Sequence, residues 1–309
     1  MKVSKGVTGL KVLYATDGFP AADAASRVIE RLFNRALDLT VVSVTHSGSL
    51  DPGHLLVELD PIEERRKDTV EIAEAAAARL RAAGFDADTT TLEGVPGSVL
   101  VEASGNFDCI VVGAGSHSWL GNRLLGSVST YLLHSAPTSV LVVHEARPEN
   151  GQSRVVVGVD GSDTAERTAS SLASLLDPAR CSVEVISVVP VAASAALPMS
   201  IGTPEINELI AESEEGEGVE RANAAVARAV RVFEEKGFGV TSRVERGGPA
   251  AVLLQAAHDQ RADLIGVGSR GLGPIRRALL GSVSDNVARL SSAAFIGRFS
   301  STTDETERT

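Results

Sequence analysis

The segment IVVGAGS at residues 110–116 returns in altered form as IGVGSRG at residues 265–271. Behind each of these glycine-containing segments, at the same spacing, stands an identical LGSVS element, at 125–129 and again at 280–284. Several elements that recur in one order and at one spacing are the signature of a repeated structural unit. The chain is therefore a tandem duplication.

The beginnings of the two copies also match, since VLYATDG at 12–18 corresponds to VVVGVDG at 155–161. Between the copies lies the polar stretch RPENGQ at 147–152, which is the natural position for the seam. We therefore expect two domains, the first over residues 1–147 and the second over residues 148–309.

Each copy alternates between strand-like and helix-like segments. In the first copy, short β-branched apolar runs lie near residues 11–16, 39–44, 87–92, 109–112 and 140–143. The clearest helical patterns, 61–83 and 204–236, stop at Gly84 and Gly237. This alternation predicts an α/β fold with two tandem Rossmann-like, doubly wound domains. Each would hold a five-stranded parallel sheet of order 3-2-1-4-5 with helices on both faces, and the polar tail 300–309 is expected to be disordered.

Composition narrows the classes of function. The 309 residues contain 40 Asp and Glu against 29 Lys and Arg, a net charge of −11, which argues against nucleic acid as a partner. No apolar run is long enough for a membrane helix, and the N-terminus lacks a signal-peptide core, so a cytoplasmic protein without a membrane partner is expected. Cys109 and Cys181 lie in strand-like segments, which favours buried reduced thiols over a disulfide or a metal site.

The candidate site lies at the carboxyl ends of the strands, where ligands bind in open α/β sheets. Asp17 and Asp160 end the first strand of each copy, and the 3-2-1-4-5 order would place them beside the glycine loop after the fourth strand. In the second copy, Gly281 and Ser282 are expected to open a helix whose N-terminus favours an anion, with Ser282 also acting as the helix cap. The alternative is structural: the glycines serve a tight strand-to-helix connection, and each aspartate is a turn former before glycine.

The pattern Gly-x2-Gly-x9-Gly-Ser, with VGVDGS at 157–162 and GSVS at 281–284, resembles the nucleotide-binding signature of the universal stress protein family. The resemblance implies that the first-strand aspartate and the backbone after the second strand hold a nucleoside, while the glycine loop and its serine hold ribose and phosphates. The implied ligand is ATP or a related adenine nucleotide, with or without Mg²⁺. The residues of the second site would be Asp160, Val188, Gly268, Gly271, Gly281, Ser282 and Val283. Those of the first would be Asp17, Val44, Gly113, Ser116, Gly126, Ser127 and Val128.

The two copies differ around these loops. Ser116 stands where the second copy has Gly271. If this position requires a positive φ, a residue with a Cβ strains the backbone there. The second copy also offers arginines at 270, 276 and 277 around its loop, whereas the loop of the first copy has His117, Gly121 and Asn122. We predict tighter nucleotide binding at the second site, the alternative being that these arginines form a solvated helix face.

The last strand differs as well. The first copy keeps the strand pattern PTSVLVV at 137–143, whereas the second reads SAAFIGR at 292–298. In the family, this strand often pairs across a dimer interface. Gly297 and Arg298 predict a shorter, weakened edge strand in the second copy. We expect the copies to pair as a pseudo-dimer within one chain, which leaves a homodimer open.

The resemblance implies a regulatory module in stress response or dormancy. Two alternatives stay open: a slow ATP hydrolase or nucleotidyl transferase that uses the same cleft, and a protein-interaction module without nucleotide. The dinucleotide-type pattern at 266–271 follows a fourth strand rather than a first, and we find no P-loop. The sequence suggests no catalytic residues, and its histidines lack metal-ligand spacing.

Overall fold

The computed structural model describes residues 9–46, 62–115, 125–148, 151–190, 204–269 and 280–299. The predicted disorder of the tail 300–309 falls outside these ranges.

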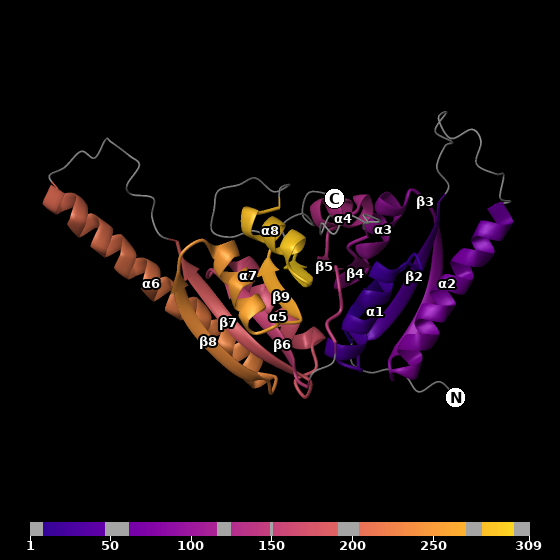
Figure 1. The fold of residues 1–309 in the computed structure, drawn as a ribbon, viewed down its shortest axis with the longest axis horizontal. Helices are drawn as coiled ribbons and strands as arrows, with labels where there is room; N and C mark the ends of the chain where they lie inside the picture. The colour runs from indigo at the N-terminus through magenta and orange to yellow at the C-terminus, as the bar shows by residue number, and fades with distance from the viewer. Residues whose placement is uncertain are drawn as a thin grey trace, which may run out of the picture.

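Strands and helices alternate in both halves, as predicted (Figure 1). The first half comprises β1 (Lys11–Ala15), α1 (Pro20–Leu32), β2 (Asp38–His46), α2 (Ile62–Ala82), β3 (Asp86–Gly94), α3 (Pro96–Ser104), β4 (Cys109–Gly113), α4 (Ser127–Ser135) and β5 (Ser139–Val143). The second half comprises β6 (Ser153–Val159), α5 (Asp163–Leu175), β7 (Cys181–Val189), α6 (Pro204–Glu235), β8 (Gly239–Arg246), α7 (Pro249–Asp259), β9 (Leu264–Gly268), α8 (Ser282–Leu290) and β10 (Ala293–Gly297).

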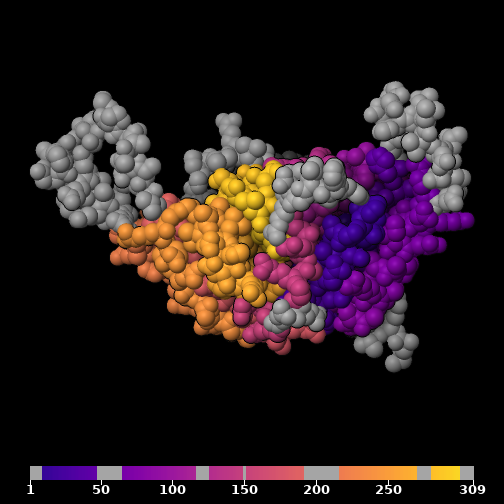
Figure 2. Space-filling model, viewed as in Figure 1, coloured from indigo at the N-terminus to yellow at the C-terminus, as the bar shows by residue number. Residues whose placement is uncertain are grey.

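The strands form one ten-stranded sheet in the order β3-β2-β1-β4-β5-β10-β9-β6-β7-β8. Each half has the predicted parallel arrangement 3-2-1-4-5. The halves join where β5 and β10 pair antiparallel, with Leu141 opposite Phe295. The α/β fold class is therefore confirmed, and the two predicted sheets are continuous. In the space-filling view, the end of the first half adjoins the second half at the centre of one continuous body (Figure 2).

Helices cover both faces of this sheet. The buried core on one face is built from α1, α2, α5 and α6, and the core on the other from α3, α4, α7 and α8. Both cores run through the seam, because each contains apolar side chains from β5 and β10. Among the described residues, we find no helix that combines the length and the apolar character needed to cross a bilayer.

The two cysteines are buried free thiols, as predicted. Cys109 lies on β4 and Cys181 on β7, and neither side chain is accessible to solvent. Burial raises the pKa of Cys181 to about 12 and raises that of Cys109 as well. Because the thiolate is the reactive form of cysteine, both side chains act as small core residues.

The prediction of a short, weakened last strand is wrong. β10 is five residues long, as is β5, and every residue of β10 is buried. A Cβ on Gly297 would lie 1.9 Å from the Thr168 Oγ1 atom, so the glycine admits the close approach of α5. Arg298 donates a hydrogen bond from Nη1 to the carbonyl oxygen of Ala136 at 2.7 Å, across the seam. The expected pairing of the two copies within one chain is confirmed.

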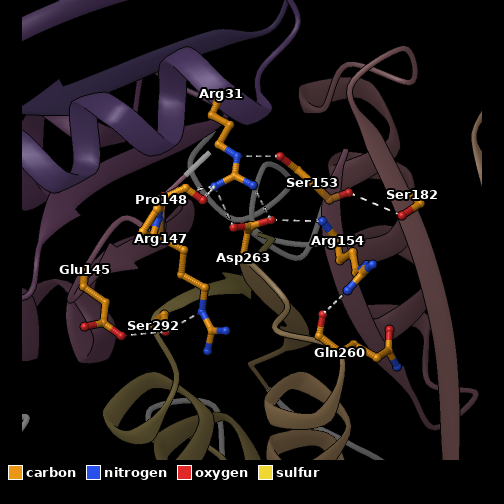
Figure 3. A network of polar contacts seen from close by, with 10 residues as sticks. All are labelled: Arg31, Glu145, Arg147, Pro148, Ser153, Arg154, Ser182, Gln260, Asp263 and Ser292. Carbon is orange, nitrogen blue, oxygen red and sulfur yellow. Dashed lines mark hydrogen bonds and ion pairs between the residues drawn. The ribbon is translucent and has the colours of Figure 1, made fainter. Parts of the chain in front are cut away.

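A polar network ties the halves together beside this strand pair (Figure 3). Arg31, on α1, forms an ion pair with Asp263 of the second half, with Nη1 and Oδ1 3.0 Å apart. The guanidinium also donates to the Ser153 hydroxyl at 2.9 Å and to the carbonyl oxygen of Arg147 at 3.0 Å. The N–H of Arg154 donates to Asp263 at 3.0 Å. The interface therefore combines paired strands with a buried charge pair.

Tyr14→Phe is expected to flatten the loss of stability at alkaline pH. Tyr14 is 1% exposed, and its hydroxyl donates to the carbonyl oxygen of Ala22 at 2.7 Å. Burial raises its pKa from 10.0 to about 12, so this stabilisation is complete below pH 10 and is lost as pH rises toward 12. Between pH 8 and pH 11, the free energy of unfolding measured in urea should fall by about 1.4 kcal/mol less in the variant than in the wild type. Tyr131→Phe, at a 46% exposed position, is the matched control and should keep the wild-type decline.

Candidate functional site

A pocket of about 540 Å³ lies at the carboxyl ends of the strands of the second half. Its walls come from the ends of β6, β7 and β9 and from the starts of α7 and α8, with further residues from α5 and α6. Every described residue that we predicted for the second site lines it: Asp160, Val188, Gly268, Gly281, Ser282 and Val283.

The matching pocket of the first half has a volume of about 290 Å³. It lies at the ends of β1, β2 and β4 and at the starts of α3 and α4. It brings together all the described residues predicted for the first site: Asp17, Val44, Gly113, Gly126, Ser127 and Val128. The same residue types thus meet in a cavity twice, at equivalent positions of the duplicated fold.

Both aspartates also form local turns, which was the structural alternative. The Oδ1 atom of Asp17 accepts a hydrogen bond from the N–H of Phe19 at 3.0 Å. The Oδ1 atom of Asp160 accepts from the N–H of Ser162 at 3.0 Å and from its hydroxyl at 2.6 Å. The glycine after each aspartate has a positive φ, 77° and 81°. Each carboxylate therefore shapes its turn with one oxygen while it lines the pocket.

The predicted helix starts are confirmed, but the predicted cap is wrong. α8 begins at Ser282 with Gly281 as its N-cap, and α4 begins at Ser127 with Gly126 as its N-cap. A glycine cap supplies no side-chain acceptor, and neither helix has a side-chain cap hydrogen bond. The first turn of each helix thus faces the pocket as a site of partial positive charge.

A second serine, which we did not single out, anchors each helix start. The hydroxyl of Ser129 donates to the carbonyl oxygens of Ala114 at 2.8 Å and Gly126 at 3.1 Å. In the second half, Ser284 contacts Ser269 and Gly281 in the same way, at 3.1 and 2.9 Å. Both serines are buried at the floor of the site. The sequence did contain a signal for this serine, because it is the last residue of the repeated GSVS element.

The glycines of the first half are required by the packing of the chain itself. A Cβ on Gly113 would lie 2.5 Å from the backbone carbon of Ala21, at the start of α1. A Cβ on Gly126 would lie 2.0 Å from the carbonyl oxygen of Gly115. Contacts this short exclude any side chain. The structural alternative, that these glycines allow a tight connection of the chain, is therefore correct for both positions. Their contact with a ligand stays a prediction.

One charged residue of the second pocket was missed altogether. Arg221, on α6, lines the pocket together with Gly218 and Ala222. Alignment of α2 and α6 from their terminal glycines, Gly84 and Gly237, would have shown that Asp68 occupies the matching position in the first half. The predicted loop residues Ser116, Gly271, Arg270, Arg276, Arg277, His117, Gly121 and Asn122 lie outside the described residues.

The chemistry of the described linings is simple. Each combines a carboxylate, an apolar wall, exposed backbone and a helix N-terminus. In the described ranges, we find no group of three histidine, cysteine or acidic side chains that could hold a metal ion. A carboxylate and backbone groups can pair with the polar edges of a ligand, and a helix N-terminus suits an anion.

Comparisons with known proteins agree with the duplication. The model of the universal stress protein family matches residues 10–144 and again residues 152–294. A universal stress protein of Mycobacterium tuberculosis is 30% identical over 302 residues, which cover 93% of this chain and 96% of the relative. A universal stress protein of Mycolicibacterium smegmatis is 30% identical over 296 residues, which cover 92% of this chain and 95% of the relative.

A solved structure shares the fold at lower sequence identity. The crystal structure of a universal stress protein from Archaeoglobus fulgidus has a TM-score of 0.64 and 21% identity, and the match covers 94% of this chain and 98% of that one. Since the family match occurs once in each half and both full-length relatives carry the same family name, the chain belongs to the universal stress protein family as a member with two tandem domains.

Proposed function

We propose that this protein binds ATP or a related adenine nucleotide in its two pockets, with the tighter site in the second domain. The proposed role is that of a cytoplasmic regulatory module in stress response or dormancy, with residues 1–147 and 148–309 as its two domains. One observation carries the proposal: a carboxylate and an N-terminal helix turn without a side-chain cap meet in a cavity twice, at equivalent places.

The helix starts support a phosphate-bearing ligand. Ser127 and Ser282 are the first residues of their helices and are exposed at the pocket walls. Backbone N–H groups of a first helical turn, together with the helix dipole, attract negative charge. A serine hydroxyl at that position adds one more donor for a phosphate oxygen.

The opposite wall supports a nucleoside. Val44 and Val188 lie near the ends of β2 and β7, and Asp17 and Asp160 follow the adjacent strands β1 and β6. Apolar side chains can pack on a purine face, while carboxylate and backbone groups can pair with hydroxyl and amino donors. Ligand pockets of drug-sized molecules measure roughly 300–1,000 Å³. The second pocket, at about 540 Å³, lies inside this range, and the first, at about 290 Å³, lies at its lower end.

Ser282→Asp is the sharpest test of the proposed phosphate position. An acidic residue is favourable at a helix N-terminus, so the variant should fold as well as the wild type. Its carboxylate would nevertheless repel a bound phosphate. We expect at least a tenfold loss of ATP affinity, about 1.4 kcal/mol or more, in isothermal titration with and without Mg²⁺. Ser127→Asp tests the first pocket in the same way.

Ser170→Asp is the matched control, because it adds the same charge at an exposed position of α5 that lines neither pocket. It should leave ATP affinity unchanged. Mass spectrometry of nucleotide released on denaturation should find one or two adenine nucleotides per chain. If wild-type protein neither binds ATP nor releases nucleotide, the proposal is wrong. Steady phosphate release that Ser282→Asp abolishes would instead assign a hydrolase.

A further inference from the structure

The two pockets differ most at the wall farther from the glycine loop. In the second domain, this wall consists of Val189 and Pro190 at the end of β7 with Gly218, Arg221 and Ala222 of α6. In the first domain, no described residue of α2, the equivalent helix, lines the pocket. The extra volume of the second pocket therefore opens toward α6.

A buried hydroxyl pair explains why the first pocket is closed there. The Thr45 hydroxyl, at the end of β2, donates to the Thr69 hydroxyl of α2 at 3.0 Å, and both residues are 6% exposed. The Thr69 hydroxyl donates in turn to the carbonyl oxygen of Arg65 at 2.7 Å. This chain of hydrogen bonds holds α2 against β2.

The second domain lacks this pair. Strand register aligns Thr45 with Val189, and the terminal glycines of the helices align Thr69 with Ala222. Neither replacement carries a hydroxyl, and alanine is smaller than threonine. Gly218 stands where the first domain has Arg65, so this position of the α6 wall carries no side chain.

The same helix positions also reverse the charge. Arg221 stands where the first domain has Asp68. The described lining of the second pocket thus holds one carboxylate, Asp160, and one guanidinium, whereas that of the first holds the Asp17 carboxylate without a cation. Among the residues that the structure covers, Arg221 forms no ion pair with an acidic side chain, and its Nε donates only to the carbonyl oxygen of Glu217 at 3.3 Å. A free guanidinium attracts a polyanion, and an uncompensated carboxylate repels it.

We propose that Arg221 and the absence of the threonine pair make the second pocket the more selective of the two for phosphate charge, whereas the first pocket discriminates less between ATP and adenosine. This specificity rests on the proposed function, because it concerns how strongly each of the two proposed nucleotide sites selects the phosphate group. Arg221 acts as a specificity residue on the α6 wall, opposite the helix start at Ser282.

The test compares ATP with adenosine as titrants of the full chain. Arg221→Gln removes the charge from an exposed helix position, so it should not impair folding. We expect ATP affinity to fall about tenfold while adenosine affinity changes less than twofold, because only ATP carries phosphate charge. Asp68→Asn is the matched control at the equivalent position of α2 and should change neither affinity. Val189→Thr with Ala222→Thr should narrow the second pocket and weaken ATP binding by a similar factor.

The outcomes separate this inference from the proposed function. If wild-type protein binds ATP and Arg221→Gln leaves the ratio of ATP to adenosine affinity unchanged, the specificity inference is wrong and the nucleotide function stands. If Asp68→Asn shifts the ratio as much as Arg221→Gln does, the assignment to the second pocket is wrong. If wild-type protein binds neither titrant, both proposals are overturned together.

Discussion

Arg31→Met is expected to lower the free energy of unfolding by about 3 kcal/mol at pH 7, because it leaves the carboxylate of Asp263 buried without its partner. The two side chains are 14% and 7% exposed, and two contacts join them, at 3.0 and 3.2 Å. The remaining hydrogen bond from the N–H of Arg154 keeps the expected loss at the lower end of the range for buried ion pairs. Urea unfolding measures the difference.

The deficit of Arg31→Met should shrink as pH falls. Burial already raises the pKa of Asp263, and the positive charge of Arg31 opposes that rise. Without Arg31 the pKa rises further, so the penalty is present above the folded-state pKa and disappears as the carboxyl takes up a proton. At pH 4.5 we therefore expect a smaller deficit than at pH 7.

Two comparisons make this prediction specific. Arg79→Met breaks the half-exposed ion pair with Glu30 and should cost no more than about 1 kcal/mol. Adding Asp263→Asn to Arg31→Met should restore most of the lost stability, since a neutral amide needs no counter-charge. A deficit that is equal at both pH values and insensitive to Asp263→Asn would mean that Arg31 stabilises the seam by packing alone.

Gly297→Val is expected to destabilise the protein by about 3 kcal/mol or more, because the new side chain would occupy the space of Thr168. Even a Cβ at this position would lie 1.9 Å from the Thr168 Oγ1 atom and 2.8 Å from its Cβ. Thr168 is fully buried on α5, so it cannot turn into solvent. A thermal melt of the purified variant should show the loss directly.

The first domain indicates which second substitution should restore the stability of Gly297→Val. There the strand position equivalent to Gly297 is Val143, and the helix position equivalent to Thr168 is Ala25, so the large and small residues are exchanged. Combining Gly297→Val with Thr168→Ala should recover stability to within about 1 kcal/mol of the wild type. Failure of the pair to recover, although each single variant is destabilised, would show that the two helix-on-strand packings are not equivalent.

The strands, their order and the positions of the pockets could be predicted because they depend on local patterns. Short β-branched runs between amphipathic helices specify parallel strands, and one repeat confirms the other. Thus Asp160 and Gly268, far apart in sequence, were expected at the ends of neighbouring strands, and they lie at the ends of β6 and β9. Strand boundaries deviated by one or two residues, as at β2, where the structure runs to His46.

The contacts between the two halves could not be predicted in detail. They join residues that are far apart in the sequence, and no sequence pattern indicates which residues pair. Gly297 reads as a strand breaker until Thr168 is placed opposite it. Asp263 reads as an ordinary polar residue before a strand, and only the tertiary structure brings Arg31 to it. Likewise, Arg221 lies on a helix too long for its pocket-facing turn to be recognised from periodicity alone.

The join between β5 and β10 has a consequence for how this protein can evolve. In a homodimer of identical subunits, every substitution appears on both sides of the twofold axis, so each interface residue must tolerate its own symmetry mate. Covalent fusion of the copies removes that constraint. The Arg31–Asp263 pair joins the two domains through different residue types on its two sides, and the equivalent packing pairs Thr168–Gly297 and Ala25–Val143 carry different residues. Each copy can therefore change its pocket independently of the other, while the two stay at a fixed one-to-one ratio.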